Sequence, residues 1–188
     1  MNIYFRKANS LLIALFVKWR ILWVRIKFRL CGINIIIGEN VSIGRMVQIQ
    51  VTDGGKINIG DGVTLQDFTL LCAQEGSIEI DNNTFIGVGS HLVSVESIKI
   101  GKNCLIAAYC VIRDANHGMH RDIPMFKQKQ VSAPIKIGDD VWLGAHAVVT
   151  AGSMIATGAV IGANAVVTND IPSFSIAVGV PARAIKSR

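Results

Sequence analysis

Apolar residues recur every six positions through most of this chain of 188 residues. An aliphatic residue is usually followed by Gly or by a small or acidic residue, as in Ile37-Gly38, Ile86-Gly87 and Ile161-Gly162. The fifth residue of each hexad is small or β-branched. Two inward positions per hexad, one bulky and one small, predict a narrow solenoid whose short strands turn a corner after every six residues.

Three such hexads would close one triangular coil. The coils begin at Ile37, Ile59, Ile80, Ile100, Ile137 and Ile155, which are 22, 21, 20, 37 and 18 residues apart. Most coils therefore contain three hexads with zero to four extra residues, and each buries its aliphatic residues against the next coil. This pattern predicts an all-β solenoid.

The one long spacing marks a break in the repeats. Between Ile100 and Ile137 the chain exceeds an ordinary coil by 15 to 17 residues, and the excess follows His117. We expect residues 118–134 to form a projecting loop, and long loops on rigid scaffolds often carry functional sites. His117 is the sixth residue of its hexad, which predicts an outward imidazole at the corner where the loop leaves.

Residues 1–32 form a separate N-terminal segment. Its composition from residue 8 to 30, without Gly or Pro and rich in Leu, Ile, Arg and Lys, favours a helix. Residues 1–30 hold seven of the 19 basic residues and no acidic residue, so the body has 12 basic and 13 acidic residues. This nearly neutral body argues against nucleic-acid binding. The leader suits either packing on a neighbouring subunit or peripheral contact with the inner membrane surface.

The sequence also bears on cellular location. No apolar run reaches the length of about 18 residues that a membrane-spanning helix needs, and no small-residue cleavage site follows the leader. The cysteines, Cys31, Cys72, Cys104 and Cys110, have neither metal-finger spacing nor a dense disulfide pattern. We expect a cytoplasmic protein that can lie peripherally at the inner membrane.

Motifs on both sides of the break and at the end of the repeats carry a family resemblance. The segments 114–117, 137–145, 166–172 and 177–183 resemble those of bacterial hexapeptide-repeat O-acetyltransferases of the sugar- and polysaccharide-modifying group. The resemblance implies a left-handed parallel β-helix, a homotrimer with sites between subunits, and no required metal. It also implies transfer of acetyl from acetyl-CoA to a hydroxyl group of a carbohydrate acceptor, a surface polysaccharide (capsule, lipopolysaccharide or exopolysaccharide) or its precursor.

In that family the histidine of the first motif is the general base, and the resemblance gives this role to His117. A sugar hydroxyl is a poor nucleophile, and an imidazole that titrates near neutral pH can remove its proton. Asp114 or a backbone carbonyl could hold the other ring nitrogen, but Asp114 could equally hold the turn of the loop. We expect the adjacent Asn116 to contact the acceptor.

Further contacts follow from the same resemblance. Trp142, predicted to lie one coil beyond His117, would line the acceptor or acetyl-CoA cleft, and His91 would help to bind the acceptor between subunits. The residues expected to contact acetyl-CoA are an aromatic residue, small residues and basic residues near the end: Trp142, Gly144, Ala145, Ala163, Thr168, Arg183 and Lys186. The β-helix would occupy residues 33–172, and residues 173–188 would form a cap and coenzyme-binding tail.

Other functions remain open at this point. The protein could acetylate an amino sugar on nitrogen, or it could acetylate a small molecule such as serine or a drug. It could be a zinc enzyme of the γ-carbonic-anhydrase type, with His91, His117 and His120 as ligands, although the Trp142 motif favours the acetyltransferases. It could also be a non-catalytic solenoid scaffold. The sequence contains no G-x-S-x-G motif, which favours direct transfer without an acyl-enzyme.

Overall fold

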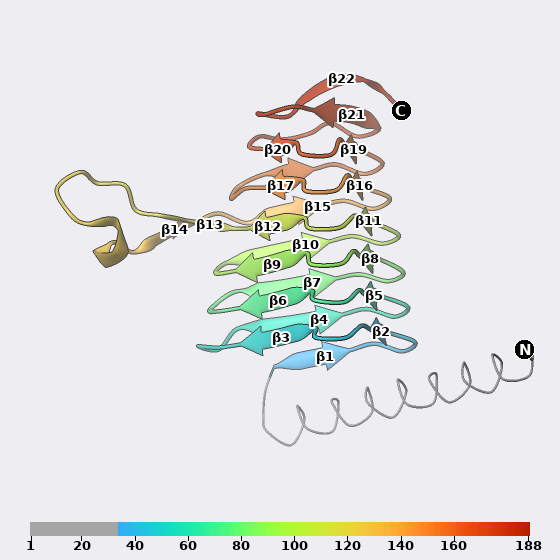
Figure 1. Ribbon diagram of the computed structural model, residues 1–188, viewed down its shortest axis with the longest axis horizontal. Coiled ribbons are helices and arrows are strands. Elements are labelled where there is room, and N and C mark those ends of the chain that lie inside the picture. Colours follow the sequence, from blue (N-terminus) through green and yellow to red (C-terminus); the bar gives the residue numbers. More distant parts are fainter. Residues whose placement is uncertain (1–33) are drawn as a thin grey trace, which may run out of the picture.

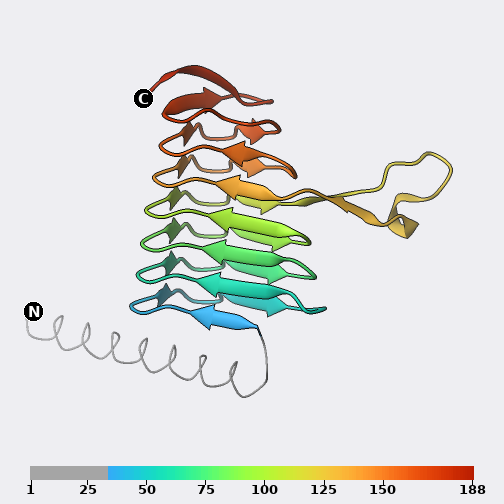
Figure 2. The ribbon, with the colours of Figure 1, turned by 180° about the vertical axis from the view of Figure 1, so that it is seen from behind.

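The computed structural model describes residues 34–188, which form a stack of triangular coils (Figure 1). Each coil contributes one short strand to each of three parallel sheets. Figure 2 shows the same stack from behind, with the strands of successive coils lying above one another. The helix predicted for residues 1–32 lies outside the described residues.

The three sheets form the sides of the prism. Sheet A contains β1 (Ile35–Ile37), β4 (Lys56–Ile59), β7 (Ser77–Ile80), β10 (Ser97–Ile100), β15 (Ile135–Ile137) and β18 (Met154–Ile155). Sheet B contains β2 (Ser42–Ile43), β5 (Thr64–Leu65), β8 (Phe85–Ile86), β11 (Leu105–Ile106), β16 (Trp142–Leu143), β19 (Val160–Ile161), β21 (Ser175–Val178) and β22 (Arg183–Ser187). Sheet C contains β3 (Gln48–Val51), β6 (Leu70–Ala73), β9 (His91–Ser94), β12 (Val111–Arg113), β17 (Val148–Val149) and β20 (Val166–Val167).

The core consists of equivalent side chains stacked from coil to coil. In sheet A, Ile57, Ile78, Ile98 and Ile135 pair in register, and each is at most 1% exposed. The small inward residues are buried as well: Val41, Val63, Thr69, Thr84, Ser90, Cys104, Cys110, Val141, Ala147, Ser153, Ala159 and Ala165. Both inward positions of the hexad are therefore confirmed, and the fold is a left-handed parallel β-helix.

The glycine after the aliphatic residue serves close packing between coils. At Gly138, a Cβ atom would lie 2.6 Å from the backbone nitrogen of Thr157 in the next coil. A contact that short with backbone cannot be relieved by a side-chain rotation. The corner therefore needs glycine because the neighbouring backbone occupies the space of a side chain.

The break in the repeats forms an arm that projects away from the coils (Figures 1 and 2). Its stem is an antiparallel ribbon of β13 (Ala115–His117) and β14 (Gln130–Ser132), and its distal part includes the short 3-10 helix η1 (Met125–Lys127). The arm thus begins three residues before the predicted loop, because Ala115 already pairs with Ser132. The prediction that His117 lies at a coil corner is wrong, since it lies on this ribbon.

The last two strands close the C-terminal end of the stack. β21 pairs in parallel with β19, and β22 folds back antiparallel to β21. Ile171, Ala177 and Ala182 are at most 3% exposed in this region, so the hairpin and the turn before it complete the core. No helix within residues 34–188 has the length and hydrophobicity needed to cross a bilayer.

Candidate active site

His117 lies on the stem of the arm, where its side chain is exposed. Its backbone is paired with Gln130, and the adjacent Asn116, also exposed, is paired with Val131. Among residues 34–188, no hydrogen bond or ion pair engages the imidazole. Both ring nitrogens are thus accessible to an incoming group, although the ribbon fixes the backbone that carries them.

Asp114 lies at the base of the arm and is fully buried. Its carboxylate accepts hydrogen bonds from Ser94 Oγ (2.7 Å), the Val95 N–H (2.7 Å) and the Glu96 N–H (3.0 Å). These groups belong to the corner of the coil below, and they use both carboxylate oxygens. Of the two roles considered for Asp114, the structure shows the one that holds the turn, and the predicted orientation of His117 by Asp114 is corrected accordingly.

The distal part of the arm is organised by Gln128, which sequence reasoning did not single out. Its amide nitrogen donates to the carbonyl oxygens of His120 (2.8 Å) and Ile123 (2.6 Å), and its Oε1 accepts from the His120 N–H (2.9 Å). Around this clamp the arm exposes large apolar side chains: Met119, Ile123, Met125, Phe126 and Val131. Because these contacts are local to the arm, only its stem connects it to the coils.

Trp142 lies on sheet B and is 52% exposed. It stands in register between Leu105 and Val160 and borders a hollow of about 370 Å³. The arm instead leaves from the end of β12 in sheet C, and Figure 1 shows it on the opposite side of the stack from β16. Trp142 thus lies one coil beyond His117, as predicted, but on a different face of the stack, so the two side chains do not meet within one chain.

The same hollow contains Arg188, another residue that the sequence did not indicate. Its Nη1 donates to Asp140 Oδ2 at 2.9 Å and to the Gly158 carbonyl oxygen at 3.3 Å. These contacts join residues 48 and 30 positions apart. They depend on how the final hairpin folds back across sheet B, and no local sequence signal encodes that.

Four of the predicted coenzyme contacts meet at the corner between sheets B and C. Gly144 and Ala145 form this corner in one coil and Ala163 in the next, where a Cβ atom on Gly144 would lie 2.5 Å from the Ala163 nitrogen. Arg183 pairs with Val178, whose side chain covers the neighbouring Gly162. Arg183 therefore lies beyond a strip of small residues that runs along the stack.

The other three predicted coenzyme contacts, Trp142, Thr168 and Lys186, lie elsewhere. Thr168 follows β20 at the opposite end of sheet C, where its hydroxyl donates to Asn169 Oδ1 at 2.8 Å. Lys186 pairs with Ile176 on sheet B, in the column that contains Trp142. The structure thus divides the predicted coenzyme residues between the B–C corner, sheet B and the far end of sheet C.

His91 opens β9 and is exposed between Leu70 and Val111 of the neighbouring coils. Close to it, at the B–C corner, the Tyr109 ring stacks on His146 with centroids 5.2 Å apart and planes 18° from parallel. The sequence pattern did not predict this aromatic pair. The sequence signal that could have indicated the pair is Tyr109 itself, an aromatic residue at a turn position that small or polar residues usually fill.

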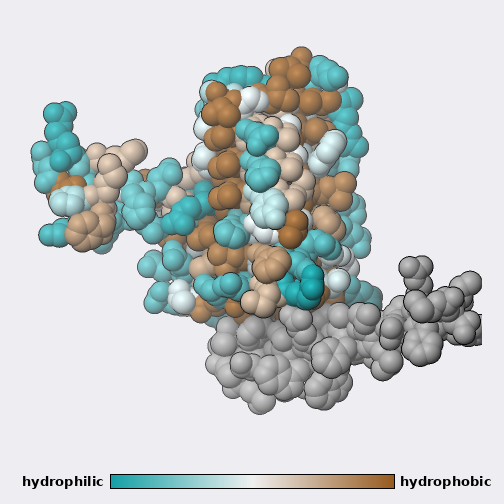
Figure 3. Space-filling model, in the orientation of Figure 1, coloured by the Kyte–Doolittle hydropathy of each residue, from teal (hydrophilic) through white to brown (hydrophobic). Residues whose placement is uncertain are grey.

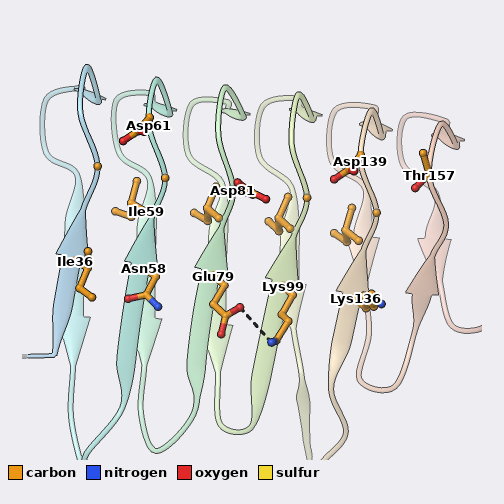
Figure 4. Close-up of a pocket in the computed structure, with 17 residues that line it drawn as sticks. Ile36, Asn58, Ile59, Asp61, Glu79, Asp81, Lys99, Lys136, Asp139 and Thr157 are labelled. Atoms are coloured by element: carbon orange, nitrogen blue, oxygen red, sulfur yellow. Dashed lines mark ion pairs between the residues drawn. The ribbon is translucent and has the colours of Figure 1, made fainter.

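A longer hollow of about 760 Å³ runs along sheet A and its corner with sheet B (Figure 4). It contains the Glu79–Lys99 ion pair (3.2 Å) but none of the predicted site residues. Its Asp61 and Asp139 carboxylates accept the Glu39 and Lys102 backbone N–H groups at 2.6 and 2.8 Å. These acids therefore stabilise the corner, and the candidate site lies on the other faces.

The histidines considered as zinc ligands occupy different elements. His91 is on β9 of sheet C, whereas His117 and His120 are on the arm. Within the part of the chain that the structure describes, no three His, Cys, Asp or Glu side chains converge as potential metal ligands.

Two sequence profiles match the coils. The profile described as bacterial transferase hexapeptide (six repeats) matches residues 134–169, and the profile described as the hexapeptide repeat of succinyl-transferase matches residues 77–113. Together they cover coils on both sides of the arm.

Individual proteins resemble more of the chain. A protein of Mycobacterium tuberculosis named as an acetyltransferase is 34% identical over 88% of this chain, which spans 56% of that relative's length. A protein of Escherichia coli named as a lipopolysaccharide biosynthesis O-acetyl transferase, WbbJ, is 37% identical over 72% of this chain and 74% of its own length. The solved structure of a variant of AntD, a Bacillus cereus N-acyltransferase in complex with dTDP-4-amino-4,6-dideoxyglucose and coenzyme A, superposes with a TM-score of 0.71 at 26% identity, covering 87% of this chain and 89% of that one.

Proposed function

This chain belongs to the hexapeptide-repeat acetyltransferases, and from that membership we propose that it transfers acetyl from acetyl-CoA to a sugar hydroxyl of a surface polysaccharide or its precursor. The lipopolysaccharide-related O-acetyl transferase among its relatives supports this acceptor class. The coenzyme A in the AntD complex supports an acyl-CoA donor. The observation on which the proposal chiefly rests is the exposed His117 on the stem of a projecting arm, where no described residue engages its imidazole.

In the proposed reaction His117 acts as the general base. Its neutral imidazole takes the proton from the sugar hydroxyl as the oxygen attacks the thioester carbonyl. The carbon–sulfur bond then breaks, and the departing coenzyme thiolate recovers the proton from the imidazolium. No acyl-enzyme forms. Asp114 contributes by holding the base of the arm, so a residue of the acceptor or of another subunit would have to hold the second ring nitrogen.

The acetyl-CoA chain would lie along the B–C corner of the last coils. Gly144, Ala145 and Ala163 present little side-chain volume there, which would let a long thin ligand approach the backbone. Arg183 is exposed beyond them, where its guanidinium could form charge-assisted hydrogen bonds to the coenzyme phosphates. Trp142 would line a separate part of the cleft that a neighbouring subunit contributes.

A homotrimer with sites between subunits would reconcile the separation of His117 from Trp142. The outer face of sheet C offers a surface for this packing, because Leu70, His91, Val111, Val148 and Val166 form a column along the coils in which only His91 is polar. Figure 3 shows hydrophobic side chains gathered in such a column on this side of the stack. The apolar residues of the arm would pack against the neighbouring copy.

The decisive experiment combines a base variant with a matched histidine control. His117→Ala should abolish acetyl transfer, measured by mass spectrometry of polysaccharide fragments and nucleotide sugars incubated with labelled acetyl-CoA. Coenzyme binding and the melting temperature should change little, because the side chain is exposed. His120→Ala removes another exposed histidine of the same arm and should retain activity. Substantial turnover by His117→Ala would refute the general-base assignment.

A second candidate is N-acylation of an amino sugar. The observation that favours it is the superposition with the AntD complex, whose sugar carries an amino group. An amine is a better nucleophile than a hydroxyl group, so loss of His117 should reduce such a reaction less. Offering dTDP-4-amino-4,6-dideoxyglucose and its hydroxyl counterpart in one assay, and identifying which one gains mass, separates the two candidates.

The basic leader is the basis of a proposal about location. We propose that the protein is cytoplasmic and lies peripherally at the inner membrane, with the basic side chains of residues 1–30 at anionic headgroups. The chain should then sediment with vesicles that contain anionic lipid and not with neutral vesicles. Deleting residues 1–30 should abolish this sedimentation, and unchanged sedimentation would contradict the proposal.

A further inference from the structure

The turn at the corner between sheets A and B shows which residues favour a left-handed backbone conformation with positive φ. One residue per coil has a positive φ there, and in the first six coils it is always Asn, Asp or Gly: Asn40, Gly62, Asn83, Asn103, Asp140 and Gly158. These residue types adopt the left-handed conformation at the lowest cost. In these six coils the composition of the corner therefore follows from the turn alone, whereas Phe174 (φ 53°) occupies the equivalent position in the last turn.

The corner between sheets B and C adopts the same conformation with different residues: Met46 (φ 54°), Phe68 (φ 61°), Gly89 (φ 66°), Tyr109 (φ 57°), His146 (φ 59°) and Asn164 (φ 58°). Bulky side chains are unfavourable in this region of φ. The core does not require them, because Met46, Phe68 and Tyr109 are 66%, 58% and 52% exposed. Strained positions of this kind concentrate at functional sites. We call Met46, Phe68, Tyr109 and His146 the aromatic corner.

The side chains of the aromatic corner occupy equivalent turn positions in successive coils and so form a row along the stack. Tyr109 stacks on His146 of the next coil, and on its other side it lies over Gly89, where any side chain would collide with the ring. Phe68 and Met46 continue the row in the two coils below. Successive coils are about 4.8 Å apart, so the row spans about 20 Å. It is long enough for several ligand units.

Polar groups flank this row at fixed positions. Arg45 donates from Nε (2.9 Å) and Nη2 (2.7 Å) to Asp67 Oδ2, and its carbonyl oxygen accepts the Phe68 N–H at 2.9 Å. Hydrogen bonds from the Arg45 N–H and then from its guanidinium hold the pKa of Asp67 below its usual range. The pair therefore stays ionised beside the Phe68 ring and offers both donors and acceptors without a net charge.

Exposed ring faces beside a neutral pair of charges suit a carbohydrate. The C–H faces of a sugar ring are apolar and can pack on an aromatic ring, whereas its hydroxyl groups need both donors and acceptors. A polyanion such as a nucleic acid would require excess positive charge, and this part of the corner has none. The row also begins at His146, directly after Ala145 of the proposed coenzyme strip.

We propose that the aromatic corner binds an extended carbohydrate chain, so that the acceptor is an oligosaccharide or polysaccharide and not a single sugar. This rests on the proposed function. Sugar units next to the acetylated one would lie over Tyr109, and more distant units over Phe68 and Met46, toward the first coil. Affinity for the acceptor should therefore increase with chain length.

The test compares Phe68→Asn with Phe174→Asn in the full-length protein. Phe174 is an exposed phenylalanine (54%) with φ 53° at the A–B corner, so both changes place Asn in the same backbone conformation. The probes are arrayed ladders of linear α-glucans, β-glucans and chitooligosaccharides, from single sugars to octasaccharides. The wild type and Phe174→Asn should bind longer members of at least one ladder more tightly. Phe68→Asn should bind these longer members about tenfold more weakly than the wild type does, as expected for one lost stacking contact. Its melting temperature should be no lower than that of the wild type.

The other outcomes overturn the inference. If the wild type binds no ladder with length-dependent affinity, the corner is not a chain-binding surface, whereas labelled acetyl transfer to a small acceptor would leave the proposed function intact. If Phe68→Asn changes the molar mass measured by light scattering, the row contacts a second copy of the chain. Equal loss of binding in both variants would mean that Phe68 acts only through general stability.

Discussion

At the scale of single residues, buried polar atoms are held by the backbone of neighbouring coils. Ser90 Oγ donates to the Ala107 carbonyl oxygen (3.0 Å) and accepts the Cys110 N–H (3.1 Å). Cys110 Sγ in turn donates to the Gly144 carbonyl oxygen at 3.3 Å. The small inward side chains therefore connect one coil to the next through hydrogen bonds as well as through packing.

The environment of Cys110 predicts how its thiol behaves. Burial raises its pKa to about 11, from a reference value of 9.0. The folded state then favours the protonated thiol, so this contribution to stability is complete below about pH 9 and is lost as the pH rises toward about 11. Native protein should resist alkylation at Cys110 by iodoacetamide, detected by mass spectrometry, until denaturant is added.

A Cys110→Ser variant provides the control for the pH effect, because Ser90 occupies the equivalent position one coil below. Its melting temperature should fall less steeply than that of the wild type between pH 8 and pH 10. Rapid alkylation of Cys110 in the native protein, or parallel pH curves for the two proteins, would contradict this account.

Removing the Asp114 carboxylate should destabilise the base of the arm. Asp114→Ala would leave the buried Ser94 hydroxyl and the partly buried Val95 and Glu96 N–H groups without their acceptor. We expect a loss of about 3 kcal/mol in unfolding free energy, measured by chemical denaturation. Asp114→Asn keeps one acceptor oxygen and should lose less. If hydrogen exchange of residues 94–96 were unchanged in Asp114→Ala, the role of the carboxylate in holding this turn would be wrong.

The sequence could predict the direction of most side chains but not their partners. The hexad placed Thr84 and Cys104 inside the coils, and both are fully buried. The hexad pattern could not predict that the Asp114 carboxylate binds residues 94–96, because these residues belong to the preceding coil and no local sequence signal points to them. Contacts between coils depend on the exact relative position of two neighbouring turns, and the sequence repeat determines that position only approximately.

At the scale of elements, the arm is the one part of residues 34–188 that leaves the stack. The sequence predicted its existence from the 37-residue spacing, but it placed the start at Gly118 and not at Ala115. The segment Ala115-Asn116-His117 fits the end of a hexad as well as it fits an extended ribbon, so periodicity alone could not distinguish these two structures. The pairing with residues 130–132 decides in favour of the ribbon.

The arm can be shortened without disturbing the coils. Replacing residues 118–129 by Asn-Gly joins His117 to Gln130 through the two-residue turn that antiparallel pairs favour. The melting temperature should stay within a few degrees of the wild type, because η1 contains no buried residue. If the apolar tip packs on a neighbouring copy, as proposed, light scattering should show a weaker trimer and acetyl transfer should fall despite the retained His117.

The same measurements can reject this account of the arm. A large fall in the melting temperature of the monomer would mean that the tip stabilises its own coils. An unchanged trimer with full activity would mean that the tip contributes neither to assembly nor to the site. Replacing Phe126 alone by Ser, which removes the most exposed aromatic ring of the tip (80%), should give a smaller change in the same direction.

At the scale of the whole molecule, the three faces of the prism have different chemistry. Sheet A carries the Glu79–Lys99 ion pair, sheet C carries a mostly apolar column that includes His91, and sheet B carries Trp142 in a hollow. Counting hexads gave the height of each residue along the stack but not the face on which the arm leaves. The sequence therefore could not predict that His117 and Trp142 lie on different faces, although it correctly predicted that both are exposed.

The C-terminal hairpin should stabilise the stack and shape the Trp142 hollow together. Deleting residues 183–188 would remove β22, expose the edge of β21, and free Asp140 from its ion pair with Arg188 (2.9 Å). Because an unpaired edge strand favours association between chains, we expect a lower melting temperature and aggregation on heating, followed by light scattering. Arg188→Ala removes the long hydrogen bond to the Gly158 carbonyl oxygen and the ion pair, which is exposed and worth about 0–1 kcal/mol, so its stability should be nearly that of the wild type. Both variants should make Trp142 more accessible to acrylamide quenching, best measured with Trp19 and Trp23 replaced by Phe. Equal stability of the truncated and point variants would show that β22 adds nothing to the closure of the stack beyond the contact made by Arg188.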